Sequence, residues 1–578
     1  MITKKRRVFK IKNKTKKQKE DINSIIDFRK KYINILHGNS SKVFDTKNID
    51  KLRNEFNLFA EKIDIFWKVC TKRENTNKCT RRLVDYYKEF KKYKENNYEL
   101  ENQELAESDI DFYDLKKIDN HIHLSALMTS NELKKYMIKE QLSRKKQNIT
   151  VFKMNTMIDN KNIHFNNSCR DRFDFNDFNN KYFIGKNGNK DSFKNLRQCF
   201  LKTNYGNNKL KYINTSNKKL NLHNLGSFKC NKSHYATITK IVSNIRNNQN
   251  THLDLRISLY GKGEKELNNL ASWFVKNNLQ KINNIDWYIQ IPRIPHILLK
   301  EQLLNSTDKF SVLINWYNNI FDPIKKAYKS RDNKLLTFLN KVKGFDSVDN
   351  EAEYETKYYR DIGTKINNKK IKVQINNKRN PFTYSMYLYF LWYYIGDLNK
   401  NIKNTREIFS LRPHCGELGP EHHLLTAYLL TDSICHGINL IDTNSSKITN
   451  PLKVLETNKN NTLLYLYCRE KLGCAIAPIS NNYLTRGYKC LHLDLLFNLG
   501  LNMSISSDDP LMFHLTEDPL LEDIIMVKNL YLLSFTDLVE LINNSYIING
   551  NFKPQIKLKK RNKIRTLLYN KFIKMTDL

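Results

Sequence analysis

The chain has 578 residues, of which 98 are lysine or arginine and 59 are aspartate or glutamate, so its formal net charge is +39. This length allows one large domain with additions or two to four ordinary domains. Lysine and asparagine are spread along nearly the whole chain instead of gathering in one place. The positive charge therefore does not predict a local nucleic-acid-binding surface, and we expect no nucleic-acid partner.

The apolar stretches and the cysteines indicate in which cellular compartment the protein functions. The most apolar stretch, YSMYLYFLWYYIG at 384–396, is far shorter than the roughly 20 apolar residues that a membrane span needs. It is instead typical of a buried helix. The ten cysteines contain no CxxC pair and no regular spacing, which disfavours a disulfide framework. The basic N-terminus has no apolar core of a signal peptide. These features predict a cytoplasmic protein without a membrane span.

The first 110 residues divide into two parts. Residues 1–50 are rich in lysine and arginine and have weak apolar periodicity, so we expect a basic, disordered N-terminal tail. From 51 to 110, NEFNLFAEKIDIFWKVC and RRLVDYYKEFKKYKE place apolar residues three and four apart, which predicts a helical N-terminal extension. At the other end, residues 546–578 are again basic and are expected to form a C-terminal tail.

Between 111 and 545, short apolar runs alternate with longer helical or polar segments. Each run is apolar through its body and ends in polar or ionisable residues, as in parallel strands that are covered on both faces. Eight strands separated by helices predict an α/β fold, a (β/α)8 barrel with its active site at the carboxyl ends of the strands. Extra residues after the first strand and near 351–380 and 444–461 are expected to be insertions. The predicted strands are 115–124, 253–261, 286–294, 342–348, 408–417, 432–441, 474–482 and 502–510.

Several ionisable residues stand at the predicted strand ends. His121 and His123 are two apart on the first strand, and alternate strand residues share a face, so both imidazoles can enter the barrel mouth. In HCGE, Gly416 breaks the strand between His414 and Glu417. Each feature alone has a simpler explanation, since HxH can be an incidental pair in a chain with 14 histidines.

Two further candidates follow later in the chain. Asp508 and Asp509 end the eighth strand, although an aspartate before proline is also a good helix N-cap. His436 lies early in the sixth predicted strand, where a lone histidine is often a hydrogen-bonded core residue. Considered together, His121, His123, His414 and Asp508 supply three nitrogens and one oxygen from strands one, five and eight. This donor set suits a catalytic zinc ion, and it leaves Glu417 and His436 as acid and base.

These residues also carry a family resemblance. The ordered set HxH, HCGE, HG and DDP resembles the adenosine and AMP deaminase group of metal-dependent hydrolases. The chain is more specifically similar to the AMP deaminases, through SLYGKGEKELNNLASWFVKNNL, WYIQIPRI, KGFDSVD, RPHCGE, HGINL, APISNN and SSDDPLMFHLTEDPLLE. The resemblance covers roughly 80–545. It implies a (β/α)8 barrel, in agreement with the strand count, and a homotetramer.

The resemblance also implies roles for individual residues. His121, His123, His414 and Asp508 match the ligands of one zinc ion per subunit, and His123 also touches the substrate. Glu417 matches the acid that contacts the substrate, and His436 matches the catalytic base. The substrate-binding residues implied by the family pattern are Phe178, Asn179, Asn180, Lys181 and Tyr182 in DFNNKY, and Asp509, Pro510, Leu511 and Met512 after the last strand. Asp177 stands where the family has a lysine.

The predicted function is zinc-dependent hydrolysis of AMP to IMP and ammonia, in purine nucleotide metabolism. Zinc would supply hydroxide that attacks carbon 6 of the purine, while Glu417 protonates ring nitrogen 1. One alternative is an adenosine or adenine deaminase of the same superfamily. The other is a basic nucleic-acid-binding protein on a barrel scaffold, which the complete set of polar site residues disfavours.

Overall fold

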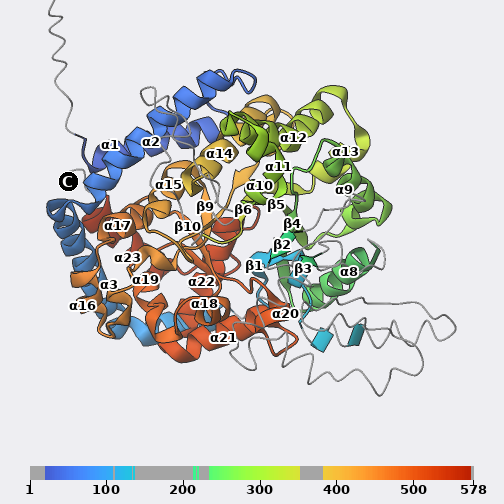
Figure 1. Ribbon diagram of the computed structural model, residues 1–578. Helices are drawn as coiled ribbons and strands as arrows, with labels where there is room; N and C mark the ends of the chain where they lie inside the picture. Colours follow the sequence, from blue (N-terminus) through green and yellow to red (C-terminus); the bar gives the residue numbers. More distant parts are fainter. Residues whose placement is uncertain are drawn as a thin grey trace, which may run out of the picture.

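A computed structural model describes the protein over residues 20–108, 111–129, 131–132, 135–136, 213–215, 218–220, 233–351 and 382–574 (Figure 1). Nine parallel strand segments lie at the centre of the molecule, in two sheets. In spatial order, the first sheet contains β1 (Lys117–His123), β4 (Thr251–Ser258), β5 (Ile285–Pro292), β6 (Val342–Val348) and β7 (Ser410–Leu411). The second contains β8 (His414–Cys415), β9 (Ser433–His436), β10 (Gly473–Ile476) and β11 (Met503–Ile505).

The two sheets join at both ends into one closed barrel. Only Arg412 and Pro413 separate β7 from β8, so these two segments are one interrupted strand, and proline has no N–H to donate. At the other seam a parallel bridge pairs Ile122 with Asp508. Across that bridge the amide of His123 donates to the carbonyl of Asp508 at 3.0 Å. The predicted α/β fold with parallel strands is confirmed, the strand arrangement is consistent with the predicted (β/α)8 barrel, and all eight predicted strands overlap observed ones.

The sixth strand is shorter than predicted. It ends at His436, whereas the sequence pattern placed that residue early in a strand reaching 441. The cause is the backbone, because His436 has a φ of 72° and Gly437 has a φ of 91°, both in the left-handed region. A non-glycine residue in this conformation is strained, and such strain gathers at functional sites.

Helices surround the barrel on its outer side (Figure 1). In the first half of the described chain they are α1 (Ile22–Leu36), α2 (Ile49–Thr71), α3 (Arg73–Ala106), α8 (Ser233–Asn248), α9 (Lys265–Lys276), α10 (Pro295–Leu298), α11 (Lys300–Asn305), α12 (Lys309–Ser330) and α13 (Asn333–Leu339). Next come α14 (Tyr384–Ile402), α15 (His422–Leu430), α16 (Pro451–Thr457), α17 (Asn461–Arg469), α18 (Pro478–Leu484) and α19 (Leu493–Asn498). The last are α20 (Pro510–Phe513), α21 (Pro519–Tyr531), α22 (Phe535–Asn549) and α23 (Lys559–Leu568). A short antiparallel pair, β2 (Ile213–Thr215) and β3 (Lys218–Leu220), is separate from the barrel sheets.

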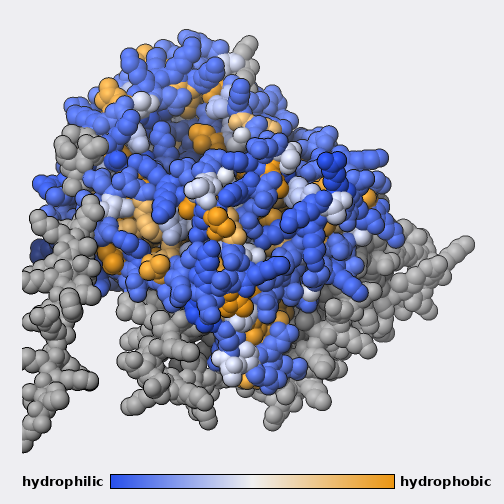
Figure 2. Space-filling model, turned by 90° about the horizontal axis from the view of Figure 1, so that it is seen from above, coloured by the Kyte–Doolittle hydropathy of each residue, from blue (hydrophilic) through white to orange (hydrophobic). Residues whose placement is uncertain are grey.

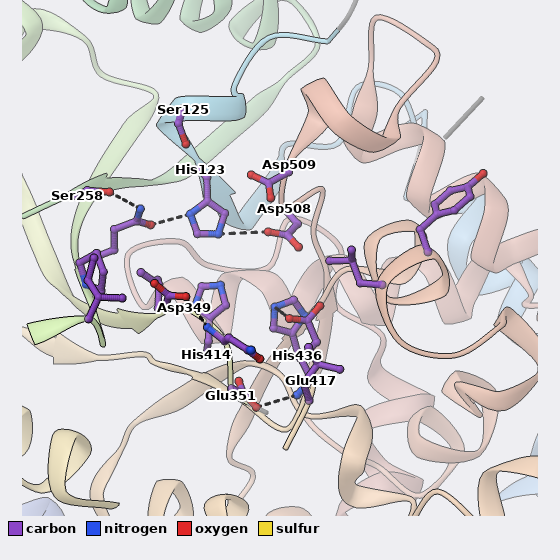
Figure 3. A pocket seen from close by; sticks show the side chains of 18 of the residues that line it. His123, Ser125, Ser258, Asp349, Glu351, His414, Glu417, His436, Asp508 and Asp509 are labelled. Carbon is purple, nitrogen blue, oxygen red and sulfur yellow. Dashed lines mark hydrogen bonds and ion pairs between the residues drawn. The ribbon is translucent and has the colours of Figure 1, made fainter. Parts of the chain in front are cut away.

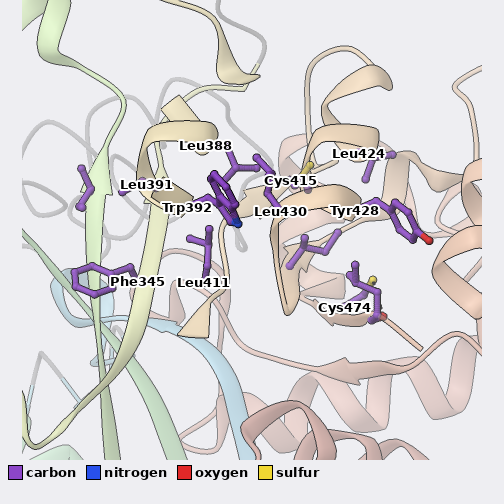
Figure 4. Packing of buried hydrophobic residues seen from close by; sticks show 14 of the residues in the cluster. Phe345, Leu388, Leu391, Trp392, Leu411, Cys415, Leu424, Tyr428, Leu430 and Cys474 are labelled. Atoms are coloured by element: carbon purple, nitrogen blue, oxygen red, sulfur yellow. Dashed lines mark hydrogen bonds between the residues drawn. The ribbon is translucent and has the colours of Figure 1, made fainter. Parts of the chain in front are cut away.

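The apolar stretch at 384–396 forms most of α14, as predicted for a buried helix. Its residues are almost completely buried; for example, Trp392 is 1% exposed and Leu388 is 0% exposed. Figure 4 shows Leu388 and Trp392 of α14 near Leu411 of β7, with Leu430 of α15 beside them. Burial of large side chains of this kind, at about 1.5–3 kcal/mol each, stabilises the position of the fifth strand, which holds His414.

The N-terminal region differs from the prediction. The prediction of a disordered tail over 1–50 is wrong for residues 20–50, because α1 forms within this range and buries Ile25 and Ile26 against the core. The helix begins with a capping box, in which the Asp21 side chain accepts from the amide of Ser24 at 2.8 Å. Its Arg29 guanidinium donates to the carbonyl of Thr431 at 3.0 Å. The many basic residues around these few apolar positions concealed the helix in the sequence.

The helical extension expected over 51–110 consists of α2 and α3, which lie along one side of the barrel in Figure 1. The basic C-terminal region packs against the extension. Arg561 of α23 is fully buried, and its Nε donates to Glu101 of α3 at 2.7 Å. Its Nη1 donates to Asp537 of α22, also at 2.7 Å. The two ends of the chain thus meet through a buried ion-pair network.

The face shown in Figure 2 is largely hydrophilic, with hydrophobic side chains scattered over it. Among the described residues, no helix has the length and apolar character that crossing a membrane would require.

Candidate metal centre and active site

A cavity of about 370 Å³ opens at the carboxyl ends of the barrel strands, within the size range of small-molecule sites (Figure 3). Residues from at least six strand ends and their loops line it, which is the position expected for the active site of this fold. Its polar described lining residues include Ser258, Gln290, Asp349, Glu351, His123, His414, Glu417, His436, Asp508 and Asp509.

His121 and His123 direct their rings to one point. Their Nε2 atoms lie 3.0 Å apart, and both side chains are buried. The register between β1 and β4 shifts between Asp119 and Ile122, at the end of the strand that bears the two histidines. Alternation along the strand explains why residues two apart share a face.

Asp508 joins the two imidazoles from the last strand. Its Oδ1 lies 3.2 Å from His123 Nε2 and 3.5 Å from His121 Nε2. The backbone of Asp508 has a φ of 60°, so the residue is held in a strained, left-handed conformation at the strand end. Burial raises the pKa of this carboxyl, but the hydrogen bond and charge of His123 outweigh burial and keep the pKa well below its ordinary value.

His414 completes the group from the opposite side of the barrel. Its ring centroid is 4.5 Å from that of His121 and 5.2 Å from that of His123. One donor atom from each of His121, His123, His414 and Asp508 lies within 4.8 Å of the others. Figure 3 shows His123, Asp508 and His414 pointing toward one another.

This arrangement fits a tetrahedral zinc ion. Two ligands that each lie 2.0–2.1 Å from such an ion are about 3.4 Å apart. The distances of 3.0, 3.2 and 3.5 Å among His121, His123 and Asp508 agree with that separation. Three imidazole nitrogens and one carboxylate oxygen are also donors that zinc prefers. The residues present therefore suit zinc.

A carboxylate behind His414 orients its ring. Asp346, at 0% exposure, accepts from the His414 backbone amide and lies 3.0 Å from His414 Nδ1. This contact leaves Nε2 to face the other ligands. The fully buried Arg256 lies 3.3 Å from the other oxygen of Asp346. A histidine ligand held by a buried carboxylate is a common arrangement in metal sites, where it fixes the ring and its tautomer.

Glu417 and His436 lie next to the metal group and to each other. Asn481 Nδ2 is 3.0 Å from Glu417 Oε1 and 3.1 Å from His436 Nδ1, so one amide bridges the two side chains. His436 Nε2 is buried, has no hydrogen-bond partner within the described ranges, and lies 3.7 Å from Glu417 Oε2. Burial, assisted by the charge of Asp508, raises the pKa of Glu417 to about 8. Burial also lowers the pKa of His436.

Glu351 holds the turn that carries Glu417. Its Oε2 accepts from the amides of Gly416 at 2.9 Å and Glu417 at 3.3 Å. Gly416 has a φ of 73°, and a Cβ on it would come within 2.6 Å of Leu424, so only glycine fits this turn. Glu351 thus fixes the direction of the Glu417 side chain through its backbone.

The predicted substrate-binding residues have different outcomes. Asp509 lines the cavity, whereas Pro510, Leu511 and Met512 belong to the four-residue helix α20, are buried, and are absent from the cavity wall. Residues 177–182, which include the predicted segment Phe178, Asn179, Asn180, Lys181 and Tyr182, lie outside the described residues.

The sequence patterns did not single out Ser258, Gln290, Asp346, Asn481 and Glu351. The first three lie among the last three residues of the observed strands β4, β5 and β6, but a single serine, glutamine or aspartate has no distinctive spacing. Asn481 stands at the polar end of the predicted strand 474–482, so the rule that selected His121 and His414 could have found it, although the structure places it in α18. Glu351 follows the predicted strand 342–348, and no spacing in the sequence marks it.

Comparison with known proteins gives consistent matches. A family model described as AMP deaminase matches residues 3–563. The AMP deaminase of Saccharomyces cerevisiae is 32% identical over 470 residues, which cover 77% of this chain and 50% of that protein. AMP deaminase 1 of Homo sapiens is 31% identical over 463 residues, covering 76% of this chain and 53% of the human protein. The chain spans about half the length of the curated relatives it matches.

Among solved structures, an adenine deaminase from Arthrobacter aurescens matches 80% of this chain and 99% of its own. Its TM-score is 0.39 and its sequence identity is 12%. These values are too low to bear on fold or function.

Proposed function

Because the chain belongs to the AMP deaminase family, we propose that it catalyses the hydrolytic deamination of AMP to IMP and ammonia. One observation carries the proposal: three imidazoles and a carboxylate converge on one point beside a partly buried acid, Glu417, and a buried histidine, His436. Hydrolytic removal of an amine needs an activated water, a proton donor and a binding site, and these groups can provide all three.

We assign zinc to the group formed by His121, His123, His414 and Asp508. Bound there, zinc would supply Lewis acidity that lowers the pKa of a water molecule toward neutrality. His414 is oriented for this purpose by Asp346. The remaining steps depend on the side chains of the cavity itself.

Glu417 is assigned as the proton donor to ring nitrogen 1 of the purine. Protonation at that atom prevents negative charge from building up on the ring while water attacks carbon 6. A carboxyl with its pKa raised to about 8 still holds its proton at neutral pH, which a donor requires. Glu351 and Asn481 hold Glu417 in place from its backbone and its side chain.

His436 is assigned as the group that takes or orients the proton of the attacking water. Because burial lowers the pKa of His436, the ring stays neutral at physiological pH and can accept a proton. Among the residues that the structure describes, its Nε2 has no hydrogen-bond partner, and it lies near Glu417. Asp509, on the cavity wall next to the metal group, is assigned to hold the purine.

The phosphate of AMP needs binding groups beyond those of the described cavity wall. The described lining residues include five carboxylates and no lysine or arginine, the five being Asp349, Glu351, Glu417, Asp508 and Asp509. A phosphate dianion needs cationic or hydrogen-bond donors. Lys181 is our candidate by family resemblance. The absence of a described cation is also the specific observation that favours the second candidate function, deamination of adenosine or adenine.

A substrate panel tests the proposal. Purified protein loaded with zinc should release ammonia from AMP with a kcat/KM at least about tenfold above that for adenosine, because a charge-assisted contact is worth roughly 1.5–3 kcal/mol. Equal use of AMP and adenosine would assign the protein to the nucleoside deaminases, and adenine alone would assign it to the base deaminases. We further propose that the enzyme is cytoplasmic and that it forms a homotetramer. Analytical sedimentation of the purified protein can measure the oligomeric state.

A further inference from the structure

His123, Gln290 and Ser258 form a continuous hydrogen-bonded row across three neighbouring strands, β1, β5 and β4. Figure 3 labels His123 and Ser258 at the two ends of this row. His123 Nδ1 lies 2.6 Å from Gln290 Oε1, and Gln290 Nε2 lies 2.6 Å from Ser258 Oγ. All three residues are at least nine-tenths buried, with exposed fractions of 8%, 6% and 3%. All three also line the cavity.

The direction of each hydrogen bond follows from the first. His123 Nε2 faces His121 and Asp508, and a nitrogen that binds a cation must present a lone pair. The ring proton is then on Nδ1, which donates to the carbonyl oxygen of Gln290. The opposite orientation of the Gln290 side-chain amide is excluded, because it would place the N–H groups of Gln290 against the Nδ1 proton of His123. The amide nitrogen of Gln290 must consequently face Ser258, whose oxygen accepts.

Once Ser258 Oγ accepts from Gln290, its own hydrogen has to point elsewhere. A hydroxyl has one proton to donate and two lone pairs, so the accepting role leaves the donor available. Ser258 lies at the carboxyl end of β4 and contributes to the cavity wall, where a substrate oxygen can accept that proton. The proton on Nδ1 of the metal ligand His123 therefore determines, through Gln290, that the Ser258 hydroxyl donates toward the substrate.

We infer that Gln290 is a positioning residue that fixes His123 for the metal and thereby makes the Ser258 hydroxyl a hydrogen-bond donor to an oxygen of the substrate. That oxygen belongs to the ribose or the phosphate, since adenine has no oxygen acceptor. The part concerning Ser258 rests on the proposed function. The part concerning Gln290 concerns zinc affinity alone and stands apart from turnover.

The row differs from the support of His414, which is a carboxylate. Asp346 brings a negative charge that Arg256 balances, whereas Gln290 brings none. The essential property of Gln290 is thus its acceptor oxygen. Gln290→Glu keeps an acceptor for the His123 Nδ1 proton, and Gln290→Leu removes it with a side chain of similar size.

The first experiment measures zinc affinity by competition with a chelator. Gln290→Leu should bind zinc about 10–100-fold more weakly than the unaltered protein, and Gln290→Glu should bind it at least as tightly as the unaltered protein. The exposed Gln302→Leu serves as the matched control, and thermal melts of the metal-free proteins verify folding. Unchanged affinity in Gln290→Leu, or equal losses in the Leu and Glu variants, would overturn the role of Gln290.

The second experiment measures kcat/KM for AMP and adenosine in Ser258→Ala, with the exposed Ser330→Ala as control. If the acceptor is phosphate, kcat/KM should fall about 10–150-fold for AMP alone. If the acceptor is a ribose oxygen, kcat/KM should fall about 2–10-fold for both substrates. Zinc affinity should stay unchanged in this variant. Unaltered kcat/KM for both substrates would refute the donor role. If the unaltered protein turns over neither substrate, the proposed function fails, and the zinc measurement still decides on Gln290.

Discussion

Asp346 contacts His414 twice, accepting from its backbone amide and meeting its Nδ1, with both distances at 3.0 Å. The pKa of this buried carboxyl lies well below its ordinary value, because the contact with His414 and the charge of Arg256 outweigh the effect of burial. Asp346 therefore stays ionised throughout the physiological range. A permanent negative charge behind a histidine strengthens that histidine as a metal ligand.

Asp346→Asn should weaken zinc binding about 10–100-fold, because the neutral amide retains the size of the carboxylate and loses its charge. Chelator competition measures this change, and Asp50→Asn on the exposed face of α2 is the control. Zinc affinity equal to that of the unaltered protein would show that the charge of Asp346 does not support the metal.

His414→Ala and Glu417→Gln should separate metal binding from proton donation. His414→Ala removes a ligand and should lose zinc and turnover together. Glu417→Gln should retain zinc, while kcat falls by about 10²–10⁴ because an amide cannot donate a carboxyl proton. Metal analysis and ammonia release on the same preparations test both statements. Loss of zinc in Glu417→Gln would make this residue a ligand and contradict its assignment as the acid.

The pH dependence of kcat/KM should be bell-shaped. Glu417 must hold its proton, and its pKa is raised to about 8 by burial and by Asp508, so activity should be lost as pH rises through about 8. His436 must be neutral, and burial lowers its pKa below the ordinary value of about 6.5, so activity should persist until the pH falls below that value. A profile that keeps rising above pH 9 would contradict proton donation by Glu417.

Ile25→Ala tests whether α1 is part of the fold. Ile25 is fully buried, and removing a buried isoleucine side chain costs about 2–5 kcal/mol. Urea denaturation should show this loss, while Lys30→Ala, on the exposed side of α1, should change stability by less than about 0.5 kcal/mol. Equal stability of both variants would mean that α1 does not pack on the barrel in solution.

Parts of this molecule could be predicted from sequence because they depend on local patterns. The strands are short, apolar and bounded by polar residues, and His121, His123, His414 and Asp508 each stand at such a boundary. The end of the sixth strand could not be predicted, because the left-handed backbone of His436 depends on its surroundings. The segment 444–461 has the composition of an insertion, yet α16 lies there with Val454 and Leu455 fully buried. A segment with few apolar residues among many polar ones has a weak hydrophobic pattern. Its structure is decided by tertiary contacts, which the local sequence does not reveal.

The contact between Arg561 and Glu101 joins residues that are 460 positions apart. A ribosome that adds about 5–20 residues per second needs about 20–90 s to make the intervening chain. During that time the ion pair between Glu101 and Arg561 cannot form, and α23 cannot yet cover the face of α3 that it will occupy. The N-terminal helices can therefore reach their final stability only after α23 has been synthesised. Packing of α3 should consequently be completed late, because it depends on a helix that is made much later than α3 itself.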